Sequence, residues 1–160
     1  MEEISDNKDL KDIICKLKDK MQIFQFVSND EIEKIIPCFK IKAYPAGAAI
    51  FKEGDMGDFI GFVISGKLEV RKQTDFKGKQ IVLALLGKGS FAGELSMIDG
   101  QPRTATIMAL EDSALLVLGS QTLNSFIERH PEIGVKILKG VIRTISIRLT
   151  KTIERLTSLF

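Results

Sequence analysis

The sequence predicts an α+β fold: a small antiparallel barrel or jelly roll with helices before it and a long helix after it. Three observations support this prediction. Apolar residues recur at helical spacing before residue 39, short β-type runs separated by glycines follow up to residue 119, and helical spacing returns from residue 120 to the end. The 160 residues, 44% of them hydrophobic, are enough for one domain with a sizeable core.

The N-terminal part predicts two helices. Residues 1–20 carry charges of both signs around one apolar stripe, which predicts an N-terminal helical segment, and residues 21–160 form the domain that follows. Ser28 and the two residues after it precede Glu31, which is typical of a helix start, and Pro37 ends that helix. The stripe of the first helix consists of Leu10, Ile13, Ile14, Leu17 and Met21.

The middle of the chain, from residue 39 to residue 119, predicts the strands. Strand-like runs alternate with turn signals, a spacing typical of a small antiparallel barrel or jelly roll. The runs are FKIKAY, AAIFKEG, FIGFVISG, KLEVRKQ, QIVLALLG, TATIMAL and ALLVLG. The turns are expected at Gly47, Gly54-Asp55, Gly57-Asp58, Ser65-Gly66 and Lys77-Gly78.

Alternation assigns faces to two of these strands. Leu68 and Val70 share one side of their strand, and Val82, Ala84 and Leu86 share one side of theirs. These side chains can line a pocket or pack in the core.

The C-terminal part predicts a helix capped by Ser120 that runs to Arg129, and then a long helix over about 131–158 with Pro131 in its first turn. Apolar positions in the long helix recur in steps of four and three, which is a heptad pattern. This seam favours a homodimer, but it also fits a helix that packs on its own domain. Its residues are Leu138, Ile142, Ile145, Leu149, Thr152, Leu156 and Leu159.

The segment from Phe91 to Thr106, FAGELSMIDGQPRTAT, carries the clearest functional signal. Glu94 and Arg103 stand among small and turn-forming residues, and the stretch after Gly93 predicts one short helix followed by a tight turn. A guanidinium grips phosphate oxygens, whereas a carboxylate accepts hydrogen bonds from a donor such as a ribose hydroxyl. The pair therefore predicts a ligand with a phosphate and a ribose; the alternative is a surface ion pair around an ordinary turn.

This segment closely resembles the phosphate-binding cassette of cyclic nucleotide-binding domains, the sensor domains of catabolite activators and protein kinase A regulatory subunits. G-E-L begins at Gly93, P-R-T-A begins at Pro102, and Ala92 is the single departure from the family pattern. The resemblance implies an eight-stranded jelly roll, a ribose contact from Glu94 and a phosphate contact from Arg103. The full set of ligand-binding residues implied by it is Gly93, Glu94, Leu95, Ser96, Arg103, Thr104 and Ala105, with Val70, Ala84 and Leu86 against the base and sugar.

The resemblance implies cAMP or cGMP as the ligand and no other cofactor. Threonine at position 104 resembles the guanosine-responsive members. The expected function is a stand-alone cyclic nucleotide sensor, not an enzyme, that moves its flanking helices for an unknown effector. The alternative is an accessory or dimeric protein of the catabolite-activator class that senses another small effector without a DNA-binding domain of its own.

Composition argues against several other classes of protein. A net charge of +2 is not the large excess of positive charge that is typical of nucleic-acid-binding proteins. A chain that ends at Phe160 is also expected not to bind DNA directly. One histidine and two isolated cysteines predict no metal site. The absence of a signal peptide and of an apolar run near ~18 residues predicts a cytoplasmic protein without a membrane span. The last helix carries a basic stripe of Arg148, Lys151 and Arg155. This pattern fits contact with phosphate, a membrane surface or an acidic partner, and it also fits a solvated face.

Overall fold

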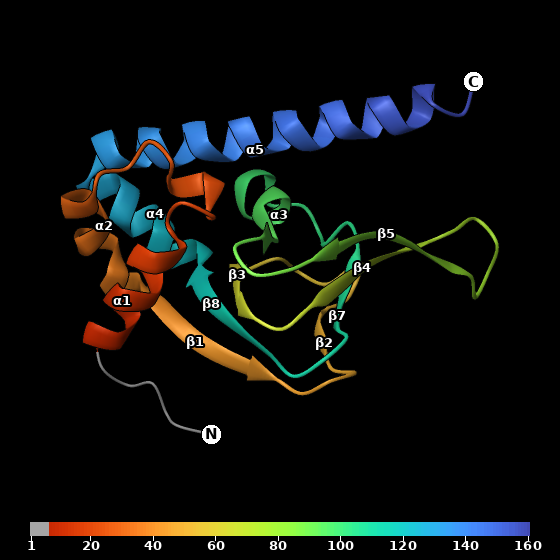
Figure 1. Ribbon diagram of the computed structural model, residues 1–160, viewed down its shortest axis with the longest axis horizontal. Helices are drawn as coiled ribbons and strands as arrows, with labels where there is room; N and C mark the ends of the chain where they lie inside the picture. Colours follow the sequence, from red (N-terminus) through yellow and green to blue (C-terminus); the bar gives the residue numbers. More distant parts are fainter. Residues whose placement is uncertain (1–6) are drawn as a thin grey trace.

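The computed structural model describes residues 7–160, so the first six residues of the predicted N-terminal segment lie outside the described part (Figure 1). Short helices gather at one end of the molecule, the strands form a roll beside them, and one long helix runs across both (Figure 1). The helical elements of the N-terminal part are α1 (Asn7–Leu17), η1 (Gln22–Phe24), α2 (Asn29–Ile35) and η2 (Ile36–Cys38).

The start of α2 is the capping box that the sequence predicts. The Ser28 hydroxyl accepts a hydrogen bond from the Glu31 N–H at 3.2 Å, and the Glu31 carboxylate accepts one from the Ser28 N–H at 2.9 Å. Two backbone donors that the helix leaves free are thereby satisfied. Glu31 also pairs with Lys136 of the long C-terminal helix at 2.6 Å, which ties α2 to the far end of the chain.

The roll confirms the predicted fold class. Eight antiparallel strands form two four-stranded sheets, with the orders β1-β8-β3-β6 and β2-β7-β4-β5. The short strand β6 is the first part of the cassette and pairs with β3, and the sequence pattern did not separate it as a strand. The strands are β1 (Phe39–Tyr44), β2 (Ala49–Phe51), β3 (Phe59–Ser65), β4 (Leu68–Gln73), β5 (Gln80–Leu86), β6 (Phe91–Ala92), β7 (Thr106–Ala109) and β8 (Ser113–Gly119).

Two apolar clusters hold these layers together. One lies between the two sheets and includes Val63 and Leu68. The other joins the helices to the roll through a chain of aromatic rings in which Phe62 contacts Phe24, Phe39 and Phe91 at centroid distances of 5.6–5.8 Å. The cassette therefore begins on a residue that is anchored in the main core.

The two C-terminal helices are α4 (Ser120–Arg129) and α5 (Pro131–Thr157). Pro131 lies in the first turn of α5, as predicted. The predicted cap by Ser120 is wrong, because Ser120 is already helical and Gly119 is the capping residue. The Ser120 hydroxyl is buried without a partner in the described chain, whereas its N–H donates to the Asp58 carbonyl at 2.8 Å.

The first half of α5 is fixed on the domain. Ile133, Ile137, Val141 and Thr144 are buried at helical spacing against the main core. Close contact with η1 requires glycine at position 140, because a Cβ there would lie 2.0 Å from the carbonyl oxygen of Ile23.

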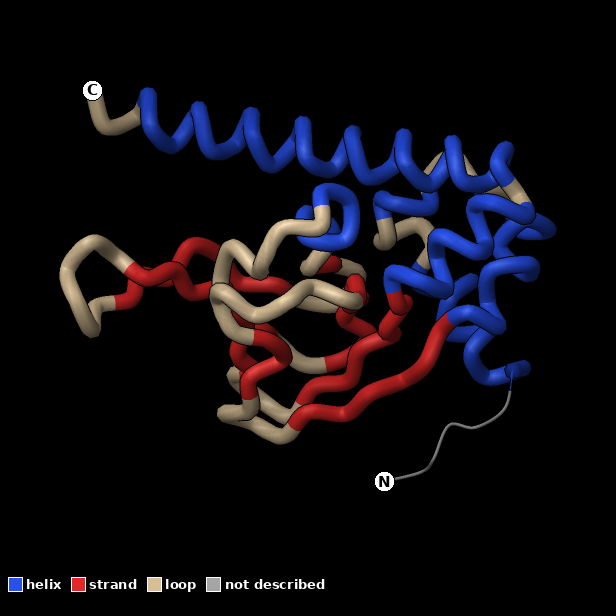
Figure 2. Tube along the Cα trace, turned by 180° about the vertical axis from the view of Figure 1, so that it is seen from behind, coloured by secondary structure: helices blue, strands red, loops and turns tan. Residues whose placement is uncertain are grey.

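The second half of α5 is exposed to solvent. Every residue from 149 to 160 is exposed, and in both views this part of the helix runs above the strands in the direction of the hairpin between β4 and β5 (Figures 1 and 2). The predicted seam is therefore only partly available to a partner, since Ile145 is half-buried against the core. Its exposed apolar members are Leu138, Ile142, Leu149, Leu156 and Leu159.

Candidate functional site

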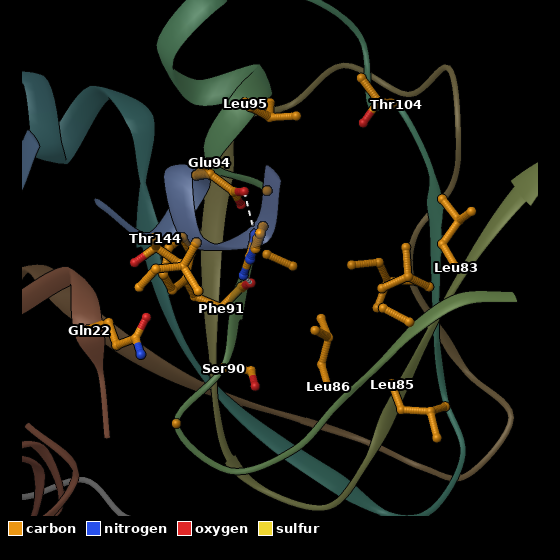
Figure 3. A pocket seen from close by; sticks show the side chains of 18 of the residues that line it. Gln22, Leu83, Leu85, Leu86, Ser90, Phe91, Glu94, Leu95, Thr104 and Thr144 are labelled. Atoms are coloured by element: carbon orange, nitrogen blue, oxygen red, sulfur yellow. Dashed lines mark hydrogen bonds and ion pairs between the residues drawn. The ribbon is translucent and has the colours of Figure 1, made fainter. Parts of the chain in front are cut away.

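A cavity of about 580 Å³ lies between the cassette, strands β4 and β5, and the underside of α5. The cassette contains the short helix α3 (Glu94–Asp99). Nine of the ten predicted ligand-binding residues line this cavity, and the tenth, Ala105, does not. Figure 3 shows Glu94 and Phe91 on one side of the cavity and Leu83 and Leu86 on the other.

Gly93 sets the geometry of the cassette. Its φ of +95° is a left-handed conformation that residues with a Cβ rarely adopt. A Cβ at this position would also lie 2.5 Å from Nη1 of Arg103 and 2.7 Å from the Phe59 carbonyl oxygen. Glycine therefore lets the start of α3 approach the arginine closely.

Arg103 is a buried cation, with only 3% of its surface exposed. Its Nη2 donates to the Phe59 carbonyl at 2.8 Å, and its Nη1 donates to the Gly93 carbonyl at 3.1 Å. The rings of Phe51 and Phe59 lie 3.9 and 4.8 Å from the guanidinium carbon. Both rings therefore pack on the guanidinium and hold its plane in place.

The guanidinium of Arg103 lacks an anionic partner within the described chain, where no carboxylate forms an ion pair with it. Its Nε is buried and has no hydrogen-bond acceptor among residues 7–160. Burial lowers the pKa of Arg103, and the nearby carboxylates of Asp58, Asp55 and Glu94 oppose that shift. A buried charge is costly unless it is paired, so this arrangement is suited to receiving an anion.

Glu94 is paired with α5 and not with Arg103. The residue is 5% exposed, and its Oε1 accepts a hydrogen bond from Nη1 of Arg148 at 2.6 Å (Figure 3). The alternative of a surface ion pair between Glu94 and Arg103 is therefore wrong on both counts. In the sequence these two residues flank one turn, but the fold directs their side chains to different partners.

Thr104 lies at the rim of the cavity with its backbone held in place. Its carbonyl accepts a hydrogen bond from Nζ of Lys72 at 2.7 Å, and Lys72 also pairs with Glu53. The N–H groups of Thr104 and Ala105 donate no turn, loop or side-chain hydrogen bond within residues 7–160. Both donors precede β7, and of the two residues Thr104 lines the cavity.

The apolar wall of the cavity comes from β4 and β5. Val70, Ala84 and Leu86 line it, in the positions expected from alternation. Leu83 and Leu85 line it as well, although they alternate with Ala84 and Leu86 along the strand. The assignment of one face was incomplete because the pairing of β4 with β5 shifts register here: Val70 faces Ala84 but Arg71 faces Val82, which leaves Leu83 unpaired and interrupts strict alternation.

The roof of the cavity is the part of the site that sequence reasoning missed. The basic stripe of α5 faces the cavity, although its sequence pattern also fitted a solvated face. Steps of four and three from Thr144 onward place these residues on one helical face, but only the fold shows what that face covers. The roof residues are Thr144, Ile147, Arg148, Lys151, Thr152 and Arg155.

The arrangement is suited to binding a small anion with hydroxyl groups and an apolar part. Within the described part of the chain, no group of three or more histidine, cysteine, aspartate and glutamate residues is arranged to hold a metal ion. His130 lies at the junction of α4 and α5, with its ring 5.0 Å from that of Phe126, and does not line the cavity. Over residues 7–160, no helix is both long enough and apolar enough to cross a membrane.

Residues 41–130 match the family model described as "Cyclic nucleotide-binding domain". The Cyclic AMP receptor protein of Thermus thermophilus is 35% identical over 109 residues, which cover 68% of this chain and 50% of that protein. The cGMP-dependent protein kinase 2 of Mus musculus is 29% identical over 79% of this chain and 16% of the kinase. The chain thus spans about half the length of the Thermus protein and a small part of the kinase.

Among solved structures, a cyclic nucleotide-binding domain from Methylobacillus flagellatus superposes with a TM-score of 0.85 at 27% identity. The superposition covers 96% of this chain and 85% of that one. The similarity therefore extends beyond the matched region of residues 41–130 and includes flanking helices.

Proposed function

Because the chain belongs to the cyclic nucleotide-binding domain family, we propose that it is a sensor that binds a cyclic nucleoside monophosphate in the cavity beneath α5. One observation carries this proposal. The Arg103 guanidinium is 3% exposed, lines the cavity and has no anionic partner in the described chain. A cyclic phosphate would supply the missing charge.

The phosphate end of the ligand would lie against Arg103. Two of the five guanidinium N–H groups are used by the carbonyls of Phe59 and Gly93, which leaves donors for phosphate oxygens. The unoccupied N–H groups of Thr104 and Ala105 would add neutral donors at the same end. Charge-assisted bonds from a preorganised guanidinium are about twice as strong as neutral ones, so this contact would dominate the affinity.

The ribose and the base would fill the rest of the cavity. Glu94 would accept a hydrogen bond from the ribose 2′-hydroxyl. Val70, Ala84 and Leu86 would pack against the sugar and base, and the volume of about 580 Å³ is within the usual range for a small-molecule pocket. Thr104 and Thr152 carry the hydroxyl groups available at the rim and in the roof for contacts to a base.

The output of the sensor would be a change in α5. The first half of α5 is buried in the main core and its second half is exposed, so ligand contacts to the roof can bias the second half. We further propose that the exposed apolar face of α5, including Ile142 and Leu149, pairs with a second copy of the chain. The proposed activity is binding without catalysis.

A calorimetric titration with cAMP and with cGMP tests the proposal. Saturable binding of one ligand per chain is expected for at least one of them. Linear 5′-AMP is the control, because it has the same base and ribose but lacks the cyclic phosphate, and it is expected to bind more weakly. Failure of both cyclic nucleotides to bind at millimolar concentration would refute the proposal and favour a roll that senses another effector.

A further inference from the structure

The segment that follows the cassette helix, residues 103–106, is held by the loop between β2 and β3. The Gly54 N–H donates to the Arg103 carbonyl at 2.8 Å, and the Arg103 N–H donates to the Asp55 carbonyl at 2.8 Å. Neither Gly54 nor Asp55 lines the cavity. The backbone of Arg103 is therefore fixed by main-chain contacts, which most side-chain substitutions would leave in place.

The next peptide group is held by a side chain instead. Nζ of Lys72, on β4, donates to the Thr104 carbonyl at 2.7 Å and pairs with Oε1 of Glu53 at 2.5 Å. Oε2 of Glu53 accepts a hydrogen bond from the Gln73 N–H at 3.0 Å, and the Glu53 N–H donates to the Thr106 hydroxyl at 2.9 Å. Glu53 is thus anchored at three points and holds Lys72 against Thr104.

The Glu53–Lys72 pair lies partly exposed beside the cassette. The hydrogen bond from Lys72 lowers the pKa of Glu53 from its ordinary 4.5, and the Gln73 N–H adds to this shift, so Glu53 is ionised at neutral pH. The side chains of Lys72 and Glu53 are 42% and 29% exposed. Exposed pairs contribute little to stability, so substitutions of either residue should leave the roll folded.

The Lys72 contact also controls a donor on the other side of the same peptide group. The Thr104–Ala105 peptide group is trans, and a planar trans peptide points its carbonyl and its N–H in opposite directions. Lys72 therefore sets the direction of the Ala105 N–H through the Thr104 carbonyl. This N–H donates no turn, loop or side-chain hydrogen bond within residues 7–160. The orientation of a free donor thus depends on one side chain.

We propose that Lys72, held by Glu53, is a positioning residue that presents the Ala105 N–H to the phosphate of the ligand. The inference rests on the proposed function, in which this N–H is one of the donors to the cyclic phosphate. Lys72 does not line the cavity and acts through the backbone of Thr104. Because the donor is oriented before the ligand arrives, binding does not have to order it.

The alternative is that Lys72 acts only through its positive charge, which would attract any anion in the cavity. The two roles predict opposite effects for Glu53→Gln. If charge alone matters, removal of a carboxylate near an anionic ligand should tighten binding. If position matters, Lys72 loses its charged partner, the Thr104 carbonyl is released, and binding should weaken. The direct pairing of Lys72 with Glu53 favours positioning, because the charges of the pair sum to zero.

The test is a calorimetric titration of wild type, Lys72→Met, Glu53→Gln and Lys67→Met with cAMP and with the two diastereomers of its phosphorothioate. In each diastereomer sulfur, a weak hydrogen-bond acceptor, replaces one of the two exocyclic phosphate oxygens. Methionine keeps an unbranched stem and removes both the charge and the donor. Lys67 is exposed, precedes β4 and does not line the cavity, so Lys67→Met is the matched control for the loss of one positive charge.

Lys72→Met and Glu53→Gln should each lower the affinity for cAMP by about threefold to tenfold, because one hydrogen bond to the phosphate is weakened. One diastereomer keeps oxygen at the position that the Ala105 N–H reads, and its affinity should fall to the same extent. The other carries sulfur there, and its affinity should fall by less than about twofold, since that contact is already weak. Lys67→Met should bind all three ligands like wild type.

Two results would overturn the inference. Equal losses for both diastereomers would assign Lys72 a general structural or electrostatic role, and tighter binding of cAMP by Glu53→Gln would assign it a role through charge alone. Thermal unfolding of each ligand-free variant, followed by circular dichroism, checks that the roll is folded. Glu53→Gln keeps the size of its side chain, so it serves as the second variant should Lys72→Met fail to fold.

Hydrogen exchange of the Ala105 amide provides the second readout. Saturating cAMP should slow this exchange in wild type, and the protection should be reduced in Lys72→Met. Equal protection in the two proteins would contradict a positioning role. If wild type binds cAMP and the variants match it, the proposed function stands and only this inference fails; if wild type binds no cyclic nucleotide, both fail.

Discussion

Replacing Arg103 with alanine is expected to weaken cyclic nucleotide binding by about 2–4 kcal/mol, or about 30- to 700-fold. The guanidinium has three N–H groups left after its bonds to the carbonyls of Phe59 and Gly93. Hydrogen bonds to charged groups contribute about 1.5–3 kcal/mol each, so two to a phosphate would supply about 3–6 kcal/mol. Water entering the vacated position would recover part of this, which gives the lower range.

The stability of the ligand-free protein should change much less than the affinity. The alanine variant loses two hydrogen bonds and the stacking on Phe51 and Phe59, but it also loses a buried charge that has no anionic partner in the described chain. These effects oppose each other. Thermal unfolding followed by circular dichroism would measure their balance without ligand.

The assay is a calorimetric titration of wild type, Arg103→Ala, Arg103→Lys and Arg143→Ala with cAMP and cGMP. Lysine should restore part of the affinity because it supplies the charge but not the planar fork. Arg143→Ala, on the exposed side of α5, should bind like wild type. A folded Arg103→Ala variant that binds within twofold of wild type would refute the assignment of Arg103 to the phosphate.

Four further outcomes are expected. Leu149→Asp should convert the proposed dimer to a monomer in sedimentation equilibrium while the roll stays folded, because this side chain is 58% exposed on α5; a wild type that is already monomeric at high concentration would contradict the dimer. Thr104→Ala should lower the affinity for cGMP more than that for cAMP, by up to about tenfold. Equal losses of affinity for the two ligands in titration would show that Thr104 does not take part in base recognition. Gly140→Ala should lower the free energy of unfolding by about 1–3 kcal/mol in chemical denaturation, since its Cβ would meet backbone; an unchanged midpoint would show that α5 can shift freely. The hydrogen bond from Lys136 lowers the pKa of Glu31 from its ordinary 4.5. The ionised Glu31 therefore stabilises the folded protein above that pH, and this stabilisation is lost as the pH falls through the lowered pKa. In Lys136→Met the midpoint of thermal unfolding should therefore fall less steeply with decreasing pH on the acid side. An unchanged pH dependence would show that other groups cause the loss of stability in acid.

The fold could be predicted from local patterns because the residues of each element carry its signal themselves. The capping box at Ser28 depends on neighbours within a few residues, and so does the shared strand face of Leu68 and Val70. The assignment of Ser120 as a cap failed because local preference was overridden by the junction with β8, where Gly119 takes that position.

The candidate site could be located from the cassette because one continuous segment supplies both the carboxylate and the guanidinium. The special conformation at Gly93 and the nearness of Arg103 to the start of α3 follow from residues within that segment. Arg148 could not be assigned in the same way. It is 54 residues from Glu94 along the chain, and its helical face fits solvent as well as a cavity.

The sequence by itself determined that this chain forms a glycine-punctuated roll, contains a segment that resembles a phosphate-binding cassette and has a long amphipathic helix after the roll, since these properties are encoded by spacing within short segments. Only the tertiary structure decided that Arg103 is buried without an anion in the described chain, and that Glu94 pairs with Arg148 beneath α5. The physical reason is that burial and charge pairing depend on which surfaces the core brings together. Here the packing of α5 on η1 and on the aromatic core places a distant arginine over the cassette.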